Sequence, residues 1–232
     1  MNERRWERIG AEAGIVFVVL GVIAQFLPGK PPAQNASGQT LITWIADHHS
    51  KLMWSIVLWS LASVAGLLFL ATVRARLSEA EGGHSELATA AVVGGVFAFA
   101  LNWVGGAMGA MSAYREGIGL PASTVRALWD GSNVSAMLAG IGGALFAGCV
   151  AAVVMSTGLL PRWIGWLAGV VTVAQLAGLF SPLASSGAFA PGGGFSVVVL
   201  LSVLVLFLAV AVEFLVHAEA PAPTTAPRGV PA

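Results

Sequence analysis

Six apolar stretches, each long enough to cross a lipid bilayer, constrain this chain more than any other feature. A membrane-spanning helix needs about 20 mainly apolar residues to cross a hydrocarbon core about 30 Å thick. Backbone groups in lipid find no water to bond, so such stretches fold as helices. We therefore expect an all-α integral membrane bundle of six transmembrane helices. The expected spans are residues 9–27, 52–73, 87–112, 134–155, 163–180 and 195–217.

Composition supports a membrane environment. Hydrophobic residues make up 57% of the chain and charged residues only 9%, whereas a soluble domain has about 25% charged residues. The formal net charge is zero, so there is no basic field to attract nucleic acid. We predict the lipid bilayer as a partner, no nucleic acid, one transmembrane domain over residues 1–217, and a disordered cytoplasmic tail over residues 218–232, where Pro and Ala alternate.

The distribution of Lys and Arg between the loops predicts the orientation, because cytoplasmic loops are enriched in both. With the N-terminus inside, seven basic residues lie on the inner side and four on the outer side. We therefore expect a multi-pass protein of the bacterial inner (plasma) membrane with both termini cytoplasmic. The inner residues are Arg4, Arg5, Arg8, Arg74, Arg76, Arg162 and Arg228; the outer ones are Lys30, Lys51, Arg115 and Arg126.

Two outer loops carry helical patterns of their own. Residues 40–51 place one set of side chains on an apolar face and another on a polar face, which favours a short helix lying along the outer interface, with Ser37 or Thr40 as its cap. Residues 122–129 predict a second short helix, with Gly131 after its end. The apolar set is Leu41, Ile42, Trp44 and Ile45; the polar set is Asp47, His48, His49 and Lys51.

Small residues recur at four-residue spacing through the fourth span, and such a stripe allows helices to pack closely. We expect glycine pairs on the third, fifth and first spans to match this stripe. The third and fourth spans should therefore lie inside the bundle, with the Val- and Leu-rich sixth span at its edge. The stripe is Ala136, Gly140, Ala144, Gly148 and Ala152; the pairs are Gly105 and Gly109, Gly165 and Gly169, and Gly10 and Gly14.

Asn102 and Gln175 are amides that fall at similar depth in the third and fifth spans. One interpretation is a hydrogen bond between the two helices, worth about 0.6 to 2 kcal/mol. The other is an outward-opening cavity in which both amides orient a small apolar or amphipathic ligand. Trp103 favours the cavity, because it is far from the interfacial belts where Trp usually lies. Trp54, Trp59 and Asp130 complete this candidate site.

Asp130 follows Arg126 by four residues, so it forms either an exposed ion pair or an acid above the cavity. Glu213 and His217 on the sixth span predict either a structural ion pair or a proton-coupling site. Adjacent His48 and His49 point about 100° apart on a helix, and no third ligand has a characteristic spacing. We therefore predict no metal site, and the sequence contains no cofactor-binding motif.

Two runs carry a resemblance to a known family. They are Thr40-Leu-Ile-Thr-Trp-Ile-Ala-Asp-His-His-Ser-Lys51, which leads into a span ending Val73-Arg-Ala-Arg-Leu77, and Leu159-Leu-Pro-Arg-Trp-Ile-Gly-Trp-Leu167. Together they resemble a family of uncharacterised six-span bacterial integral membrane proteins, classified as a domain of unknown function. The resemblance implies the fold and the location. It implies no activity and no site residue.

Three functional hypotheses follow. The leading one is a non-enzymatic protein that binds or helps to move a small apolar or amphipathic ligand. The second is a membrane-embedded enzyme acting on a lipid or isoprenoid substrate, with Asp130, Asp47 or Glu213 as an acid of raised pKa. The third is a packing partner of another membrane protein or of a second copy of the chain. An exposed small-residue stripe would favour the third hypothesis, and three carboxylates that face solvent or arginine would weaken the second.

Overall fold

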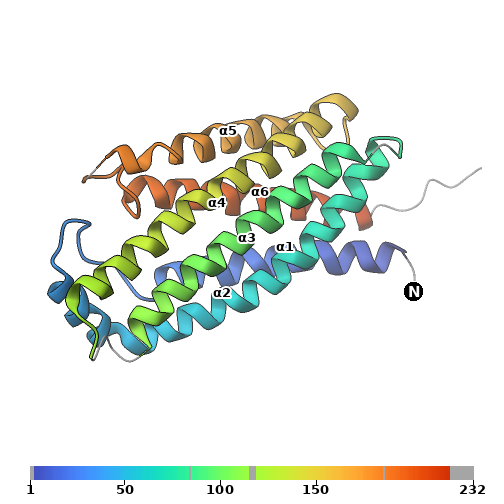
Figure 1. Ribbon diagram of the computed structural model, residues 1–232. Coiled ribbons are helices and arrows are strands. Elements are labelled where there is room, and N and C mark those ends of the chain that lie inside the picture. Colours follow the sequence, from blue (N-terminus) through green and yellow to red (C-terminus); the bar gives the residue numbers. More distant parts are fainter. Residues whose placement is uncertain (1–2, 84, 115–118, 185, 220–232) are drawn as a thin grey trace, which may run out of the picture.

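The computed structural model of this protein describes residues 3–83, 85–114, 119–184 and 186–219, and within these ranges it is helical without strands (Figure 1). Six of the helices are long and apolar enough to cross a membrane. The predicted all-α bundle of six spans is confirmed. The helices are α1 (Glu3–Phe26), α2 (Gly38–Ala80), α3 (Glu86–Ala113), α4 (Ala122–Thr157), α5 (Arg162–Gly178) and α6 (Gly194–Glu219), with a short 3-10 helix, η1 (Ser181–Leu183), after α5.

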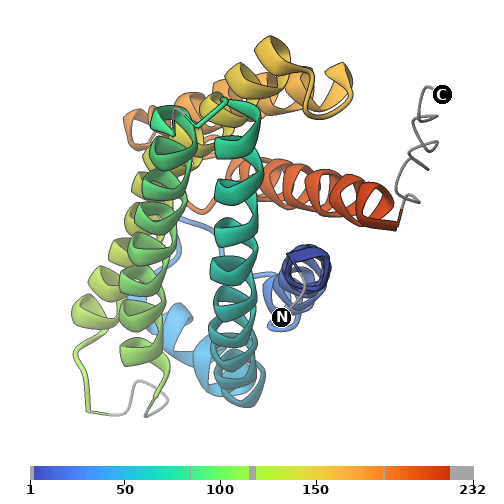
Figure 2. The ribbon, with the colours of Figure 1, turned by 90° about the vertical axis from the view of Figure 1, so that its right-hand side faces the viewer.

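Helices adjacent in the chain pack against one another, and α1 also packs against α6 (Figure 2). α4 lies between α3 and α5, and it also contacts α2 (Figure 1). The start of α1 and the end of α6 lie at one end of the bundle, which we call the terminal end. The long connections after α1 and α5 lie at the opposite, loop-rich end.

A cluster of phenylalanine rings fills the centre of the bundle. The ring of Phe207 on α6 lies 5.0 Å from that of Phe17, 5.2 Å from that of Phe69 and 5.1 Å from that of Phe146, centroid to centroid. Phe99 on α3 contacts Phe17 edge-on at 5.4 Å. Because lipid is as apolar as these rings, they stabilise the bundle mainly by close packing. Five of the six long helices are thereby joined at one packed centre.

α4 is the buried helix of the bundle. In its most apolar 18-residue stretch 61% of the residues are buried, against 28% in both α3 and α6. The prediction that the fourth span lies inside is confirmed, and the sixth span is peripheral as expected. The prediction that the third span also lies inside is wrong. One side of α3 covers α4, and the opposite side of α3 is exposed.

Glycines set how closely α4 approaches its neighbours. A Cβ atom on Gly142 would lie 2.3 Å from the carbonyl oxygen of Gly94, so the backbones of α3 and α4 are nearly in contact there. The predicted stripe faces α5 instead: Gly140 lies against Gln175, and Gly148 lies against Thr172. The centre of the stripe is therefore consumed inside the bundle.

The matching glycines behave unequally. Gly105 packs against Ser132 and Ser135 of α4, and Gly165 packs against Met155, as expected. A Cβ atom on Gly169 would meet no other atom of the described residues within 4 Å. Gly10 and Gly14 pack mainly against Thr72 and Phe69 of α2, and not against α4 as predicted.

The two predicted interfacial helices are not separate elements. Residues 40–51 are the first turns of α2, which has 43 residues, or about 64 Å at 1.5 Å per residue. Residues 122–129 likewise begin the 36-residue α4, and Gly131 lies within that helix. Ser37 does cap α2, because its Oγ accepts a hydrogen bond from the Thr40 N–H at 3.1 Å.

The chain after α6 bears on the predicted tail. α6 continues to Glu219, two residues into the segment expected to be disordered. Residues 220–232, which make up the rest of that segment, lie outside the described residues.

Candidate functional site

α2 and α4 are longer than a bilayer requires, and their excess lengths lie at the loop-rich end. Gly140 of α4 is level with Gln175 and Leu179 at the end of α5. Residues 122–135 therefore extend beyond α5 by about 21 Å. On α2, the Ser55 Oγ donates to the Ala24 carbonyl near the end of α1 at 2.7 Å. Residues 38–52 therefore extend beyond α1 by about 22 Å.

We call residues 27–52 and 122–135 the cap. α5 has 17 residues, or about 26 Å, which is close to the hydrocarbon thickness of about 30 Å. The candidate span that contains α5 continues through η1 to Leu183. The cap lies at the end of the bundle where this span ends.

The cap has a small core of its own. Leu41 and Ile45 of α2 are buried together with Ala113 at the end of α3 and Val125 of α4. Trp44 and Trp129 pack against this core, and their rings meet edge to face at 5.6 Å. The apolar face of residues 40–51, which we expected to lie along the outer interface, therefore packs against protein. This corrects the predicted interfacial placement.

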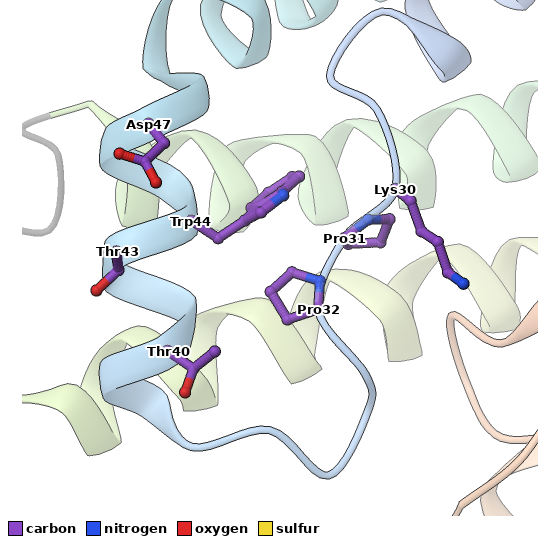
Figure 3. Close-up of a pocket in the computed structure, with 7 residues that line it drawn as sticks. All are labelled: Lys30, Pro31, Pro32, Thr40, Thr43, Trp44 and Asp47. Atoms are coloured by element: carbon purple, nitrogen blue, oxygen red, sulfur yellow. The ribbon is translucent and has the colours of Figure 1, made fainter.

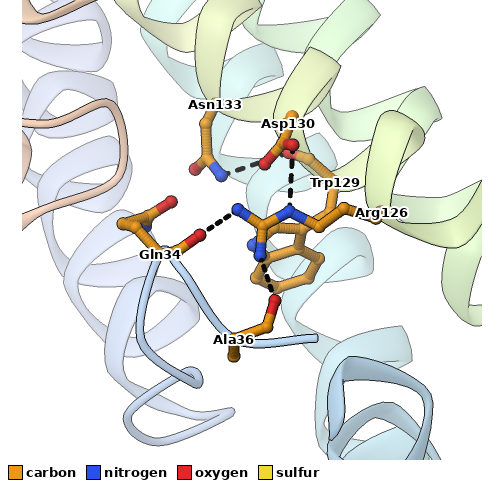
Figure 4. A network of polar contacts seen from close by, with 6 residues as sticks. All are labelled: Gln34, Ala36, Arg126, Trp129, Asp130 and Asn133. Atoms are coloured by element: carbon orange, nitrogen blue, oxygen red, sulfur yellow. Dashed lines mark hydrogen bonds and ion pairs between the residues drawn. The ribbon is translucent and has the colours of Figure 1, made fainter. Parts of the chain in front are cut away.

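Arg126 ties the α1–α2 connection to α4 (Figure 4). Its Nε donates to Asp130 Oδ2 at 2.9 Å, its Nη1 donates to the Ala36 carbonyl at 2.9 Å, and its Nη2 donates to the Gln34 carbonyl. The Arg126 side chain is only 25% exposed. Charge-assisted bonds from one planar group to three acceptors fix both position and direction. The loop is thereby held in one place above α4.

The α5–α6 connection reaches the same network. The Asn133 Nδ2 donates to the Trp129 carbonyl at 3.1 Å. A Cβ atom on Gly192 would lie 2.6 Å from both Asn133 Oδ1 and Gln34 Nε2. Gly192 also has φ of 76°, a conformation that favours glycine. The α1–α2 connection, α4 and the α5–α6 connection therefore meet at Arg126 and Asn133.

An open groove of about 530 Å³ lies beside this network (Figure 3). On one side, Thr40, Thr43, Trp44 and Asp47 follow the i, i+3, i+4, i+7 spacing that places side chains on one helical face. On the other side lie Lys30, Pro31 and Pro32 of the loop. The Trp44 ring projects from α2 toward the two prolines, and it stacks on His48 at 4.9 Å.

The predicted pairing of Asn102 with Gln175 is wrong. Asn102 is exposed on α3, and its Nδ2 donates to the Ala98 carbonyl of the same helix at 2.9 Å. Gln175 is buried, and its Nε2 donates to the Val199 carbonyl of α6 at 3.3 Å. Gln175 therefore does link two helices, but with a different partner.

The other residues of that candidate site lie in several places. Trp103 is 48% exposed on α3 and Trp54 is 61% exposed on α2. Trp59 packs against Phe17 and Gly21 of α1, and Asp130 lies in the cap. The predicted set is therefore divided among the surface of α3, the contact of α5 with α6, the contact of α1 with α2, and the cap.

The acidic candidates also differ in their surroundings. Asp130 forms the ion pair with Arg126, as one of its two interpretations predicted. Asp47 lines the groove. Glu213 is half-buried on α6, and the side chain of His217 lies outside the described part of the chain. In the described ranges, no three His, Cys, Asp or Glu side chains gather as a metal site would require.

Comparison with known proteins adds no relative, because no protein-family model, curated protein or solved structure matches the chain. The residues of the cap are therefore the basis for assigning a function. Sequence reasoning assigned no ligand role to Lys30, Pro31, Pro32, Thr40 or Thr43. The i, i+3, i+4, i+7 spacing of Thr40, Thr43, Trp44 and Asp47 is the sequence signal that could have placed these four side chains on one face.

Proposed function

We propose that this chain is a multi-pass protein of a bacterial inner membrane that binds a small amphipathic molecule in the groove of the cap. The observation that carries the proposal is the groove itself: side chains of mixed polarity, from a helix face and a facing loop, on a support outside the span of α5. Sites for small ligands combine an apolar lining with a few polar groups in this manner.

Packing and hydrogen bonds hold both sides of the groove in position. The small core under Leu41 and Ile45 fixes the helix side of the groove, and Arg126 fixes the loop that carries the other side. A site held in its binding conformation loses less conformational entropy when a ligand arrives. The arrangement therefore favours recognition over a merely connecting role for the loop.

The lining of the groove matches an amphipathic ligand. Trp44, Pro31 and Pro32 offer apolar surface. The Thr40 hydroxyl bonds to Ser37 and the Thr43 hydroxyl donates to the Gln39 carbonyl, so their oxygens face a ligand as hydrogen-bond acceptors. Proximity to the membrane favours a ligand that partitions between water and lipid. The centre of the bundle, by contrast, is filled by packed phenylalanine rings, so we do not place the ligand there.

The basic residues support the orientation with both termini in the cytoplasm. In the described parts of the chain, six arginines lie on the parts of α1, α2 and α5 nearest the terminal end, whereas three basic residues lie in the cap. Enrichment of basic residues marks the cytoplasmic side, so the cap and its groove face outward. The six arginines are Arg4, Arg5, Arg8, Arg74, Arg76 and Arg162; the cap residues are Lys30, Lys51 and Arg126.

The two alternative functions have less support. Asp130 is bonded to Arg126, so its use as a catalytic acid would break an ion pair that holds the cap together. The centre of the small-residue stripe faces α5, so it offers little surface to a partner. Ligand binding in the groove is the hypothesis that needs no rearrangement of these contacts.

The proposal is tested by binding of a dansyl-labelled single-chain lysophospholipid to the full-length protein in non-ionic detergent. Thr43→Trp fills the groove from an exposed position, and Thr89→Trp makes the same change on an exposed position of α3. We expect about tenfold or greater weakening for Thr43→Trp and no change for Thr89→Trp. Equal affinity of both variants, or absence of saturable binding to the unaltered protein, would contradict the proposal.

A further inference from the structure

Lys30 and Asp47 are the two charged groups that line the groove, and their charges are opposite. Lys30 comes from the loop and Asp47 from α2, with the Trp44 ring between them (Figure 3). We propose that the groove binds a zwitterionic phospholipid headgroup, with the phosphate toward Lys30 and the ammonium group toward Asp47 and Trp44. This inference rests on the proposed function and specifies the chemical class of its ligand.

Neither of these two charges is committed within the described residues. The ion pairs there involve other residues, and neither Lys30 nor Asp47 forms a side-chain hydrogen bond. Arg126 and Asp130, close by in the cap, are bonded to each other. The cap therefore contains one pair of charges used for its own structure and one pair left available at the groove.

The other polar and charged groups around the groove do not disturb this balance. His48 stacks on Trp44, and its Nδ1 lies 2.9 Å from the Trp44 carbonyl oxygen. Lys51 follows Asp47 by four residues but is not among the residues that line the groove. The lining is therefore neutral in total, with its two signs on opposite sides of an aromatic ring.

Charge complementarity selects the ligand class. A purely anionic headgroup would be attracted by Lys30 but repelled by Asp47. A purely cationic headgroup would be attracted by Asp47 but repelled by Lys30. A phosphate joined to an ammonium group satisfies both. An aromatic face also attracts an ammonium cation, so Trp44 and Asp47 together favour the amine end of the ligand.

The position of the groove suits a lipid headgroup. Trp54 is exposed on α2 ten residues after Trp44, about 15 Å further along the helix toward the membrane. Exposed Trp residues are typical of the interface between lipid and water. The groove thus lies on the aqueous side of this marker.

The test compares competitors for the dansyl-labelled lysophospholipid on the full-length protein in non-ionic detergent. They are lysophosphatidylethanolamine, lysophosphatidylcholine, anionic lysophosphatidylglycerol, cationic dodecyltrimethylammonium and soluble glycerophosphoethanolamine. We expect the two zwitterionic lysolipids to compete about tenfold better than the anionic or the cationic amphiphile. Competition by glycerophosphoethanolamine at the same concentration would support the same headgroup chemistry with a soluble source, and its failure would assign the site to lipid.

Charge reversal gives the second arm of the test. Asp47→Lys should invert the preference toward lysophosphatidylglycerol, and Lys30→Glu should shift it toward dodecyltrimethylammonium. Lys51→Glu reverses a neighbouring charge outside the groove and should leave the preference unchanged. Thermal unfolding midpoints confirm that each variant is folded.

The two proposals fail in different ways. Equal competition by zwitterionic and anionic lysolipids, with both weakened by Thr43→Trp, would overturn the headgroup assignment and leave ligand binding intact. Absence of saturable binding by every amphiphile would overturn the proposed function itself.

Discussion

The two ends of the bundle use charged residues differently. At the terminal end, Arg76 of α2 lies 3.3 Å from both Glu7 and Glu79, and its guanidinium group lies 5.8 Å from the Phe214 ring centre. The Glu81 carboxylate accepts hydrogen bonds from the backbone N–H groups of Leu87 and Ala88 at the start of α3. These charges close helix ends and join α1, α2 and α6.

At the loop-rich end, Arg126 bonds mainly to backbone carbonyls of a long connection, while Lys30 and Asp47 stay uncommitted beside it in the described part of the chain. The connections also differ in length. At the terminal end, α4 ends at Thr157, its C-cap Gly158 adopts a left-handed conformation, and α5 already begins at Arg162. The terminal end therefore stabilises the bundle with short turns. The loop-rich end holds a surface in position and leaves some of its chemistry available.

The largest expected loss of stability is that of Arg126→Ala, because the α1–α2 connection would lose the side chain that holds it against α4. The change leaves Asp130 without its cation and two carbonyl groups without their donor. Hydrogen bonds to charged groups contribute about 1.5 to 3 kcal/mol each. Because Asp130 is 49% exposed, water can replace part of what is lost, so we expect a loss of about 2 to 4 kcal/mol, less than the sum over three bonds. Faster proteolysis within residues 27–37 would report it.

Arg126→Lys is the matched control, because one ammonium group cannot reproduce the planar geometry of three bonds. It should restore only part of the protease resistance. Wild-type resistance in Arg126→Ala would show that the loop is held by other contacts.

A smaller effect is expected for Glu81→Ala at the terminal end. Loss of a side chain that caps the start of a helix costs about 1 kcal/mol, so the thermal unfolding midpoint should fall modestly. Lysophospholipid affinity should stay unchanged, because Glu81 lies at the opposite end from the groove. A parallel loss of affinity would break the separation between the two ends.

Glu79→Ala should have a still smaller effect on stability. The Glu79 side chain is 71% exposed, and exposed ion pairs contribute about 0 to 1 kcal/mol. Denaturation in the presence of increasing salt measures the contribution, which should shrink as screening increases. A loss above about 3 kcal/mol would place the Arg76–Glu79 contact among buried, structure-determining pairs instead.

The smallest expected stability change is that of Asp47→Asn. Asp47 is exposed and has no ion pair in the described part of the chain, so its removal should change stability by less than about 0.5 kcal/mol. Affinity for zwitterionic lysolipid should nevertheless fall. Such an effect on binding without an effect on stability is the opposite of the result expected for Glu81→Ala.

The sequence pattern predicted the spans and the burial of α4, because the length of an apolar segment and the spacing of small residues can be read locally. It did not predict the partner of Gln175, because depth along a helix does not reveal which side of the helix faces which neighbour. The partners of Arg126 are backbone carbonyls, which have no residue-type signature. The groove depends on how the loop folds back over α2, and that follows from Arg126 and the small core together.

Labelling of single cysteines in intact cells tests the central claim that the groove of the cap faces outward and binds a zwitterionic lipid. In a Cys149→Ala background, Thr43→Cys should react with a membrane-impermeant maleimide, and added lysophosphatidylethanolamine should slow the reaction. Glu79→Cys at the terminal end should react only after permeabilisation and without protection by the lipid. A Thr43→Cys variant that is unreactive in intact cells, or that the lipid does not protect, would contradict the account.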